Sequence, residues 1–190
     1  MPKSVVSLYD NPAGKLADFD FAWLRVTAKG QTNSAAALAF EKLTLRTFEA
    51  GAPWDKRAWK SELLLPAGAP DILDEPRTIF ERIDTMMPPQ GRRDLGMVLT
   101  FWTPATPTLH RAWEQVRAFV RTSLVDERGL PALLVQHAPH LAGQVTPPHI
   151  HALISARRLT FDLGAFTELE GDTAQLELFE EWSEFKTRAT

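Results

Sequence analysis

Residues 147–155 constrain the fold more than any other part of the sequence. Two prolines precede a run in which histidine and apolar residues alternate. Successive side chains of a β-strand point to opposite faces, so His149 and His151 would share one face and the intervening apolar residues the other. The run 131–137 is predicted to form a neighbouring strand. Antiparallel pairing of the two strands would place His137 beside the other two imidazoles.

Histidines in this arrangement predict a metal site. Four of the five histidines of the chain lie within residues 137–151. A single strand histidine is more often structural, but a His-x-His pair with a third histidine at hairpin distance favours a ligand set. Three neutral imidazoles suit a borderline divalent ion and leave positions open for water or substrate. We therefore expect His137, His149 and His151 to bind a divalent metal ion, with Mg, Mn and Zn left open.

Composition excludes several classes of protein. The chain has 190 residues, enough for one well-buried core but not for two complete domains. It has no cysteine, which excludes disulfides and thiolate metal sites. It shows no secretory segment and no apolar run of membrane-spanning length. We therefore expect a cytoplasmic protein without a membrane partner. The net charge of −3 does not favour general nucleic-acid binding, although a local basic face is compatible with it.

Periodicity and breakers predict helices alternating with strands in one domain. Residues 1–17 lack a clear period and are expected to form an N-terminal arm, with 18–190 as a single domain. Asn33 or Ser34 can cap the first helix, which Gly51 and Pro53 would stop. The predicted order is a strand over 19–27, helices over 34–50 and 76–87, a strand over 95–103, a helix over 108–128, strands over 131–137 and 149–155, and a helix over 173–186. This order fits an α+β fold, a mainly antiparallel sheet flanked by helices.

Three segments carry a resemblance to a known family. They are Pro148-His-Ile-His-Ala-Leu-Ile154, the preceding Leu134-Val-Gln-His137, and Arg117-Ala-Phe-Val120 in the helix before it. Together they resemble the histidine-hydrophobe-histidine relaxases, particularly the MobA/MobL type of plasmid mobilisation protein. The resemblance spans roughly residues 18–185, and the histidine motif is its specific part. It implies a relaxase-like fold.

The resemblance implies a DNA-processing activity in conjugation. Relaxases of this kind nick single-stranded DNA at a transfer origin: a tyrosine hydroxyl attacks a phosphodiester, and three histidines hold a divalent ion at the phosphate. Here the ligands would be His137, His149 and His151, whereas His140 matches no ligand position. The partners implied are single-stranded origin DNA and accessory mobilisation proteins.

The chain departs from the family at the nucleophile. The family's tyrosine lies in an alanine-rich stretch of the first helix, where this chain has Phe40. A phenyl ring has no oxygen with which to attack phosphorus, so the resemblance implies deficient nicking. The chain's only tyrosine is Tyr9, in the expected arm, and it is the sole candidate for a substitute nucleophile.

DNA contacts are predicted from basic and aromatic residues. Arginines would bind phosphates, and exposed tryptophans would stack on bases. The candidates are Arg92, Arg93, Arg157, Arg158, Trp54 and Trp59.

Two other functions are compatible with the histidines. In a metal-dependent phosphodiester hydrolase, metal-bound water would replace the tyrosine, with Asp94 or Glu114 as general base. A nucleotide hydrolase of the histidine-triad type fits poorly, because its third alternating histidine would fall at Leu153. In a scaffold protein the histidines would be structural or would bind metal without chemistry.

Overall fold

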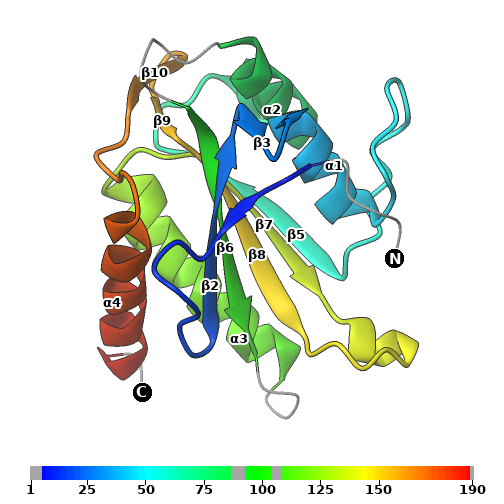
Figure 1. Cartoon of the computed structure of the whole chain (residues 1–190), viewed down its shortest axis with the longest axis vertical. Helices are drawn as coiled ribbons and strands as arrows, with labels where there is room; N and C mark the ends of the chain where they lie inside the picture. The colour runs from blue at the N-terminus through cyan, green and yellow to red at the C-terminus, as the bar shows by residue number, and fades with distance from the viewer. Residues whose placement is uncertain (1–5, 87–92, 104–107, 189–190) are drawn as a thin grey trace.

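The computed structural model describes residues 6–86, 93–103 and 108–188. They form a six-stranded sheet with helices on both faces (Figure 1). The strand order is β1-β2-β6-β8-β7-β5, and each pair of neighbours is antiparallel. The predicted α+β class with a mainly antiparallel sheet is confirmed.

The sheet joins strands from the whole chain. Its members are β1 (Tyr9–Asp10), β2 (Phe19–Arg25), β5 (Lys60–Leu64), β6 (Asp94–Trp102), β7 (Ala132–His137) and β8 (His149–Ser155). Two hairpins lie outside it, β3 (Thr27–Ala28) with β4 (Gln31–Thr32), and β9 (Arg157–Leu159) with β10 (Leu163–Phe166). The α-helices are α1 (Ala35–Thr44), α2 (Pro76–Thr85), α3 (Leu109–Phe119) and α4 (Thr173–Arg188). Shorter helical turns are η1 (Asp71–Leu73), η2 (Val120–Asp126) and η3 (Pro139–Ala142).

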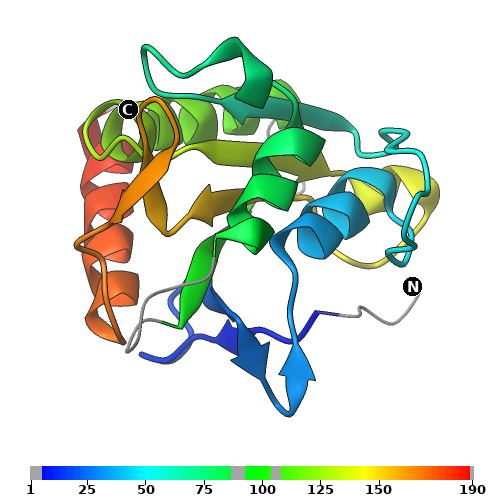
Figure 2. The ribbon, with the colours of Figure 1, turned by 90° about the horizontal axis from the view of Figure 1, so that it is seen from above.

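Each face of the sheet buries its own hydrophobic core. Alternate residues of β2, such as Phe19 and Trp23, pack with α3 and α4 on one face. The residues between them, such as Ala22 and Leu24, pack with α1 and α2 on the other. Figure 2 shows the two pairs of helices on opposite sides of the sheet. No helix in the described ranges has the length and apolar content needed to cross a bilayer.

Helix α1 starts as predicted but ends early. Ser34 caps it by accepting a hydrogen bond from the Ala37 N–H, and the carboxylate of Asp84 in α2 accepts two more N–H groups of the first turn. The predicted end near residue 50 is wrong, because Leu45 adopts a left-handed conformation (φ 57°) and stops the helix there. Its buried alanines are small, so the helix packs close to the sheet.

Two strands of the six-stranded sheet were not expected from the sequence. The edge strand β5 pairs with β7, although its burial pattern shows no strict alternation. Tyr9–Asp10 pair with β2, so this part of the expected N-terminal arm belongs to the sheet. A two-residue strand has too little periodicity to be recognised, and only its partner defines it.

Candidate metal centre

Strand pairing brings the three predicted histidines together. His137 lies opposite His149 across β7 and β8, and His151 follows two residues later on the same face. The ring centroids are 4.8–5.2 Å apart. One ligand nitrogen from each ring lies within 4.8 Å of the other two. The cluster therefore has the spatial form that the alternation predicted, on the face covered by α1 and α2.

Hydrogen bonds orient each imidazole. His137 donates from Nε2 to the carbonyl oxygen of Lys42 (2.8 Å), and His149 donates from Nδ1 to the carbonyl oxygen of Pro147 (2.9 Å). Carbonyl oxygens only accept, so the other ring nitrogen of each histidine keeps its lone pair. This is the pattern of histidine ligands held by outer hydrogen bonds.

The third imidazole is oriented by Thr100 and Lys42. The hydroxyl of Thr100 lies 2.9 Å from Nδ1 of His151, and the Lys42 ammonium lies 3.2 Å from its Nε2. An ammonium group only donates, so Nε2 accepts and Nδ1 carries the proton that is donated to Thr100. The lone pairs of His137 Nδ1 and His149 Nε2 are thus free, and that of His151 Nε2 would be free for an ion once Lys42 releases it. Three neutral imidazoles are a suitable donor set for a borderline divalent ion, so the residue types fit such an ion.

Burial keeps the imidazoles neutral. Desolvation lowers the pKa of His137 from 6.5 to about 4 and lowers that of His149 as well. Desolvation, followed by the positive charge of Lys42, holds the pKa of His151 well below its ordinary value. A metal ligand must be deprotonated, so the environment favours the binding form at neutral pH.

These shifts predict that the metal-free fold is sensitive to acid. The unfolded chain, with ordinary histidine pKa values near 6.5, binds more protons at moderately acidic pH than the folded chain does. The stability that the fold gains from keeping these histidines neutral is fully present above about pH 7 and is lost as the pH falls from 6.5 towards 4. We expect urea midpoints measured in chelator to fall over this window. A variant with His137→Gln should lose part of the dependence, and an unchanged slope would contradict the assignment.

Phe40 packs against other aromatic side chains. Its buried ring packs edge-on against Phe48 and Trp54, with centroid distances of 5.5 and 5.7 Å. Residues two apart on an α-helix point about 200° apart, so Phe40 lies on a different side of α1 from Lys42. The side chain that reaches the cluster from α1 is therefore Lys42, which sequence reasoning did not select. The pattern of apolar residues in α1 did not indicate a role for Lys42.

Tyr9 is on the wrong face of the sheet to act at the cluster. It pairs with Trp23, whose side chain lies in the core beneath α3 and α4, and Arg25 covers its ring at 4.1 Å. The histidines lie on the other face. The expectation that a mobile arm could carry Tyr9 to the metal conflicts with this strand pairing.

The tryptophans divide into packed and accessible residues. Trp54 is half-buried against Phe40, so its expected role as an exposed base platform conflicts with its packing. Trp59 is 61% exposed, and its backbone N–H donates to the backbone carbonyl of Gln136, the residue before His137. Trp102 was not selected from the sequence, yet its ring lies 4.8 Å from that of His149. Trp59, just before β5, and Trp102, at the end of β6, thus lie on either side of the cluster.

The predicted arginines that the structure describes lie at the opposite end of the sheet. Arg157 and Arg158 follow the end of β8, eight and nine residues after His149, and the strand itself spans about 20 Å. Arg157 binds the Gly164 carbonyl, and Arg158 pairs with Glu168. Exposed Arg93 precedes β6, whose other end adjoins His149, and Arg92 lies outside the described residues. These positions do not support phosphate binding beside the histidines.

The acids proposed for a hydrolase also lie elsewhere. Asp94 pairs with Arg25 at the end of β6 remote from the cluster. Glu114 contacts Lys60 and His110 on α3. Neither carboxylate is oriented toward the imidazoles, so the sequence proximity that suggested a general base was misleading.

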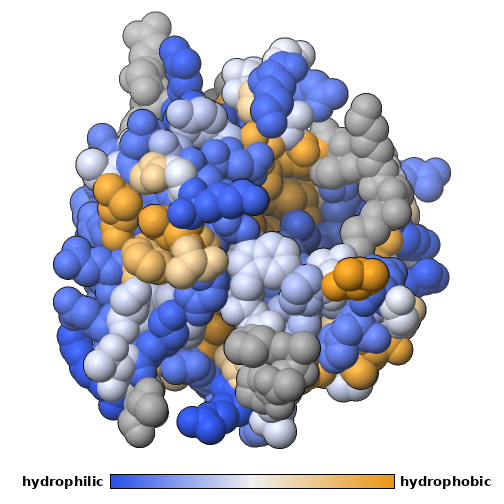
Figure 3. Space-filling model, turned by 60° about the horizontal axis from the view of Figure 1, so that its bottom comes forward, coloured by the Kyte–Doolittle hydropathy of each residue, from blue (hydrophilic) through white to orange (hydrophobic). Residues whose placement is uncertain are grey.

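The surface around the start of β8 is open and mixed in character. Figure 3 views the lower end of the sheet in Figure 1, and it shows polar surface around a hollow with hydrophobic side chains on its floor. The loop between β7 and β8 adds exposed Leu141 and Val145. His140, in the same loop, is not a member of the metal cluster. This end of the sheet therefore offers both a cluster of ligand atoms and accessible apolar contacts.

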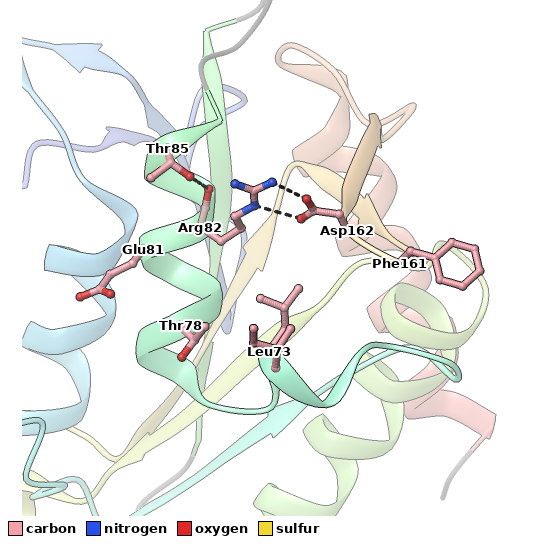
Figure 4. A pocket seen from close by; sticks show the side chains of 8 residues that line it. Leu73, Thr78, Glu81, Arg82, Thr85, Phe161 and Asp162 are labelled. Carbon is pink, nitrogen blue, oxygen red and sulfur yellow. Dashed lines mark hydrogen bonds and ion pairs between the residues drawn. The ribbon is translucent and has the colours of Figure 1, made fainter.

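A cavity elsewhere in the molecule has no comparable cluster of ligand atoms. It has a volume of about 470 Å³ and lies between α2, η1 and the turn before β10 (Figure 4). Arg82 and Asp162 in its wall form a two-point ion pair, so each neutralises the other. Exposed Phe161 and Ile72 complete its rim. The cavity has no converging free ligand atoms, which leaves the histidine cluster as the better candidate site.

Comparisons with known proteins identify a fold but no family. No family model matches the chain, and no curated protein does. Among solved structures, one described as the molecular basis of vancomycin resistance transfer in Staphylococcus aureus aligns with a TM-score of 0.67 and 18% identity. The alignment covers 90% of each chain. At this identity the likeness shows a shared fold alone.

Proposed function

We propose that this chain is a relaxase-like domain that binds single-stranded DNA and a divalent metal ion without tyrosine chemistry. The observation that carries the proposal is the convergence of three imidazole lone pairs on the open end of a relaxase-like sheet. When bound, the ion would supply positive charge to phosphate oxygens. His137, His149 and His151 would hold it, and their hydrogen bonds to Lys42, Pro147 and Thr100 would orient the rings.

Aromatic side chains on both sides of the cluster would contact the bases. Bases stack on aromatic rings with about 1–3 kcal/mol each, independently of sequence. Trp59 is exposed at the edge beside β7, and Trp102 is held by a 2.6 Å hydrogen bond from its indole N–H to Asp20. A strand of DNA whose phosphate lies at the histidines would pass between these two rings.

Plasmid transfer is the proposed biological setting. The structural neighbour is described in terms of resistance transfer in Staphylococcus aureus. That description and the histidine motif support an origin sequence as the DNA and mobilisation proteins as partners, with the MobA/MobL type as the relevant family.

Binding of a labelled oligonucleotide tests the proposal. We expect the affinity for a single strand in low salt to rise at least about tenfold when Mn²⁺ replaces chelator, because the ion adds charge at the phosphate. Duplex DNA of the same sequence is the control and should bind more weakly. Equal affinity in chelator and Mn²⁺ would indicate that the histidines have a structural role. No binding at low salt would refute the nucleic-acid function.

The same assay with Phe40→Tyr tests the nucleophile. We expect neither the unmodified chain nor the variant to form a denaturation-resistant DNA adduct, because residue 40 is buried and turned away from the side of α1 that reaches the cluster. An added hydroxyl at this buried position would also lack a hydrogen-bond partner, which would lower the free energy of unfolding by about 1–3 kcal/mol. An adduct formed by the variant would show instead that Phe40 occupies the nucleophile position.

A further inference from the structure

Lys42 brings a positive charge against a cluster of neutral side chains. Its ammonium lies among buried imidazoles, and its hydrogen-bond partner is the neutral Nε2 of His151. Burial lowers the pKa of Lys42, and the attraction of Glu41 and Asp10 offsets only part of that effect. Burying a cation without an opposite charge is unfavourable. The site is therefore electrostatically incomplete without an anion.

Lys42 and a metal ion would compete for one lone pair. The nitrogen that accepts from Lys42 is the same Nε2 that His151 would offer to the ion. An ion bound there would remove this hydrogen bond and leave two cationic groups side by side. Their repulsion is relieved when a phosphate oxygen lies close to both.

We propose that Lys42 is the phosphate-binding residue of the tri-histidine site, donating to His151 in the empty site and to a phosphodiester oxygen when the histidines hold a divalent ion. This inference rests on the proposed function and deepens it. The position of Lys42 in the last turn of α1 suits the role. The backbone carbonyl of Lys42 binds His137 at 2.8 Å, which anchors the stem while the four-carbon side chain remains flexible.

Two binding measurements on Lys42→Met test the inference. In the first, Co²⁺ is titrated into the metal-free protein and followed by its visible absorbance. Removing the competing cation is expected to tighten Co²⁺ binding about tenfold. In the second, the dinucleotide thymidylyl-thymidine is titrated into the Co²⁺-loaded protein by calorimetry. Its affinity should fall about tenfold in Lys42→Met and stay within about threefold in Lys42→Arg, which keeps the charge.

The controls distinguish a failure of this inference from a failure of the proposed function. Lys15→Met removes an exposed lysine and should change neither affinity. Unchanged or weaker Co²⁺ binding by Lys42→Met, or an unchanged dinucleotide affinity, would overturn the role of Lys42 alone. Failure of the unmodified protein to bind Co²⁺ would overturn the proposed metal site itself. Thermal melts of each variant confirm that the compared proteins are folded.

Discussion

Replacing His149 and His151 together by phenylalanine is expected to lower the affinity for Co²⁺ or Zn²⁺ by at least about a hundredfold. The free energy of a multi-ligand zinc site is shared among its ligands at roughly 3 kcal/mol each, so loss of two ligands leaves little binding. Phenylalanine keeps the ring volume, and both positions are buried on the sheet. Calorimetric titration of the metal-free protein measures the effect.

A matched control is available on α3. His110 is exposed, with 77% of its side chain accessible, and lies outside the cluster. His110→Phe should leave the metal affinity unchanged. Thr100→Val removes only the hydroxyl that holds His151 and should weaken binding about tenfold, as loss of an outer partner does. Retention of wild-type affinity by the double variant would show that the three imidazoles are structural.

Gly96→Ala is expected to be the most destabilising single substitution among the glycines of the described chain. A Cβ at this position of β6 would lie 2.4 Å from the carbonyl oxygen of Ile154 in β8. Both groups belong to backbone in the centre of the sheet, so the overlap is relieved only if the two strands separate. We expect a loss of about 3 kcal/mol or more of unfolding free energy, measured by urea denaturation.

Gly96 also lies beside a register shift in the pairing of β2 with β6. The pairing of β2 with β6 shifts between Leu24 and Arg25, and Gly96 is the residue opposite Leu24. Strand glycines commonly mark such bulges or close backbone approaches. Gly164→Ala in β10 is the control, because its nearest contact would be an ordinary 3.9 Å. Its stability should change by less than about 0.5 kcal/mol, and equal effects of the two substitutions would contradict the steric argument.

Local patterns were sufficient to predict most of the sheet and the clustering of the three histidines. The alternation in β8 placed His149 and His151 on one face, because side-chain direction in a strand depends only on neighbouring residues. The antiparallel partner of β8 was also predicted, and with it the proximity of His137. Strand β5 and the end of α1 were missed, because pairing and a left-handed Leu45 decide them rather than periodicity.

What the sequence determined by itself is therefore the α+β class and the three histidines, since both follow from short-range alternation and turn residues. The tertiary structure alone decided which neighbours those histidines have. The rotation of α1 against the sheet, set by its buried alanines and by the Asp84 cap, directs Lys42 rather than Phe40 to the imidazoles. The register of β1 with β2 likewise places Tyr9 on the far face, and that of β6 with β8 places Trp102 beside His149. Such contacts depend on long-range packing, which no local pattern encodes.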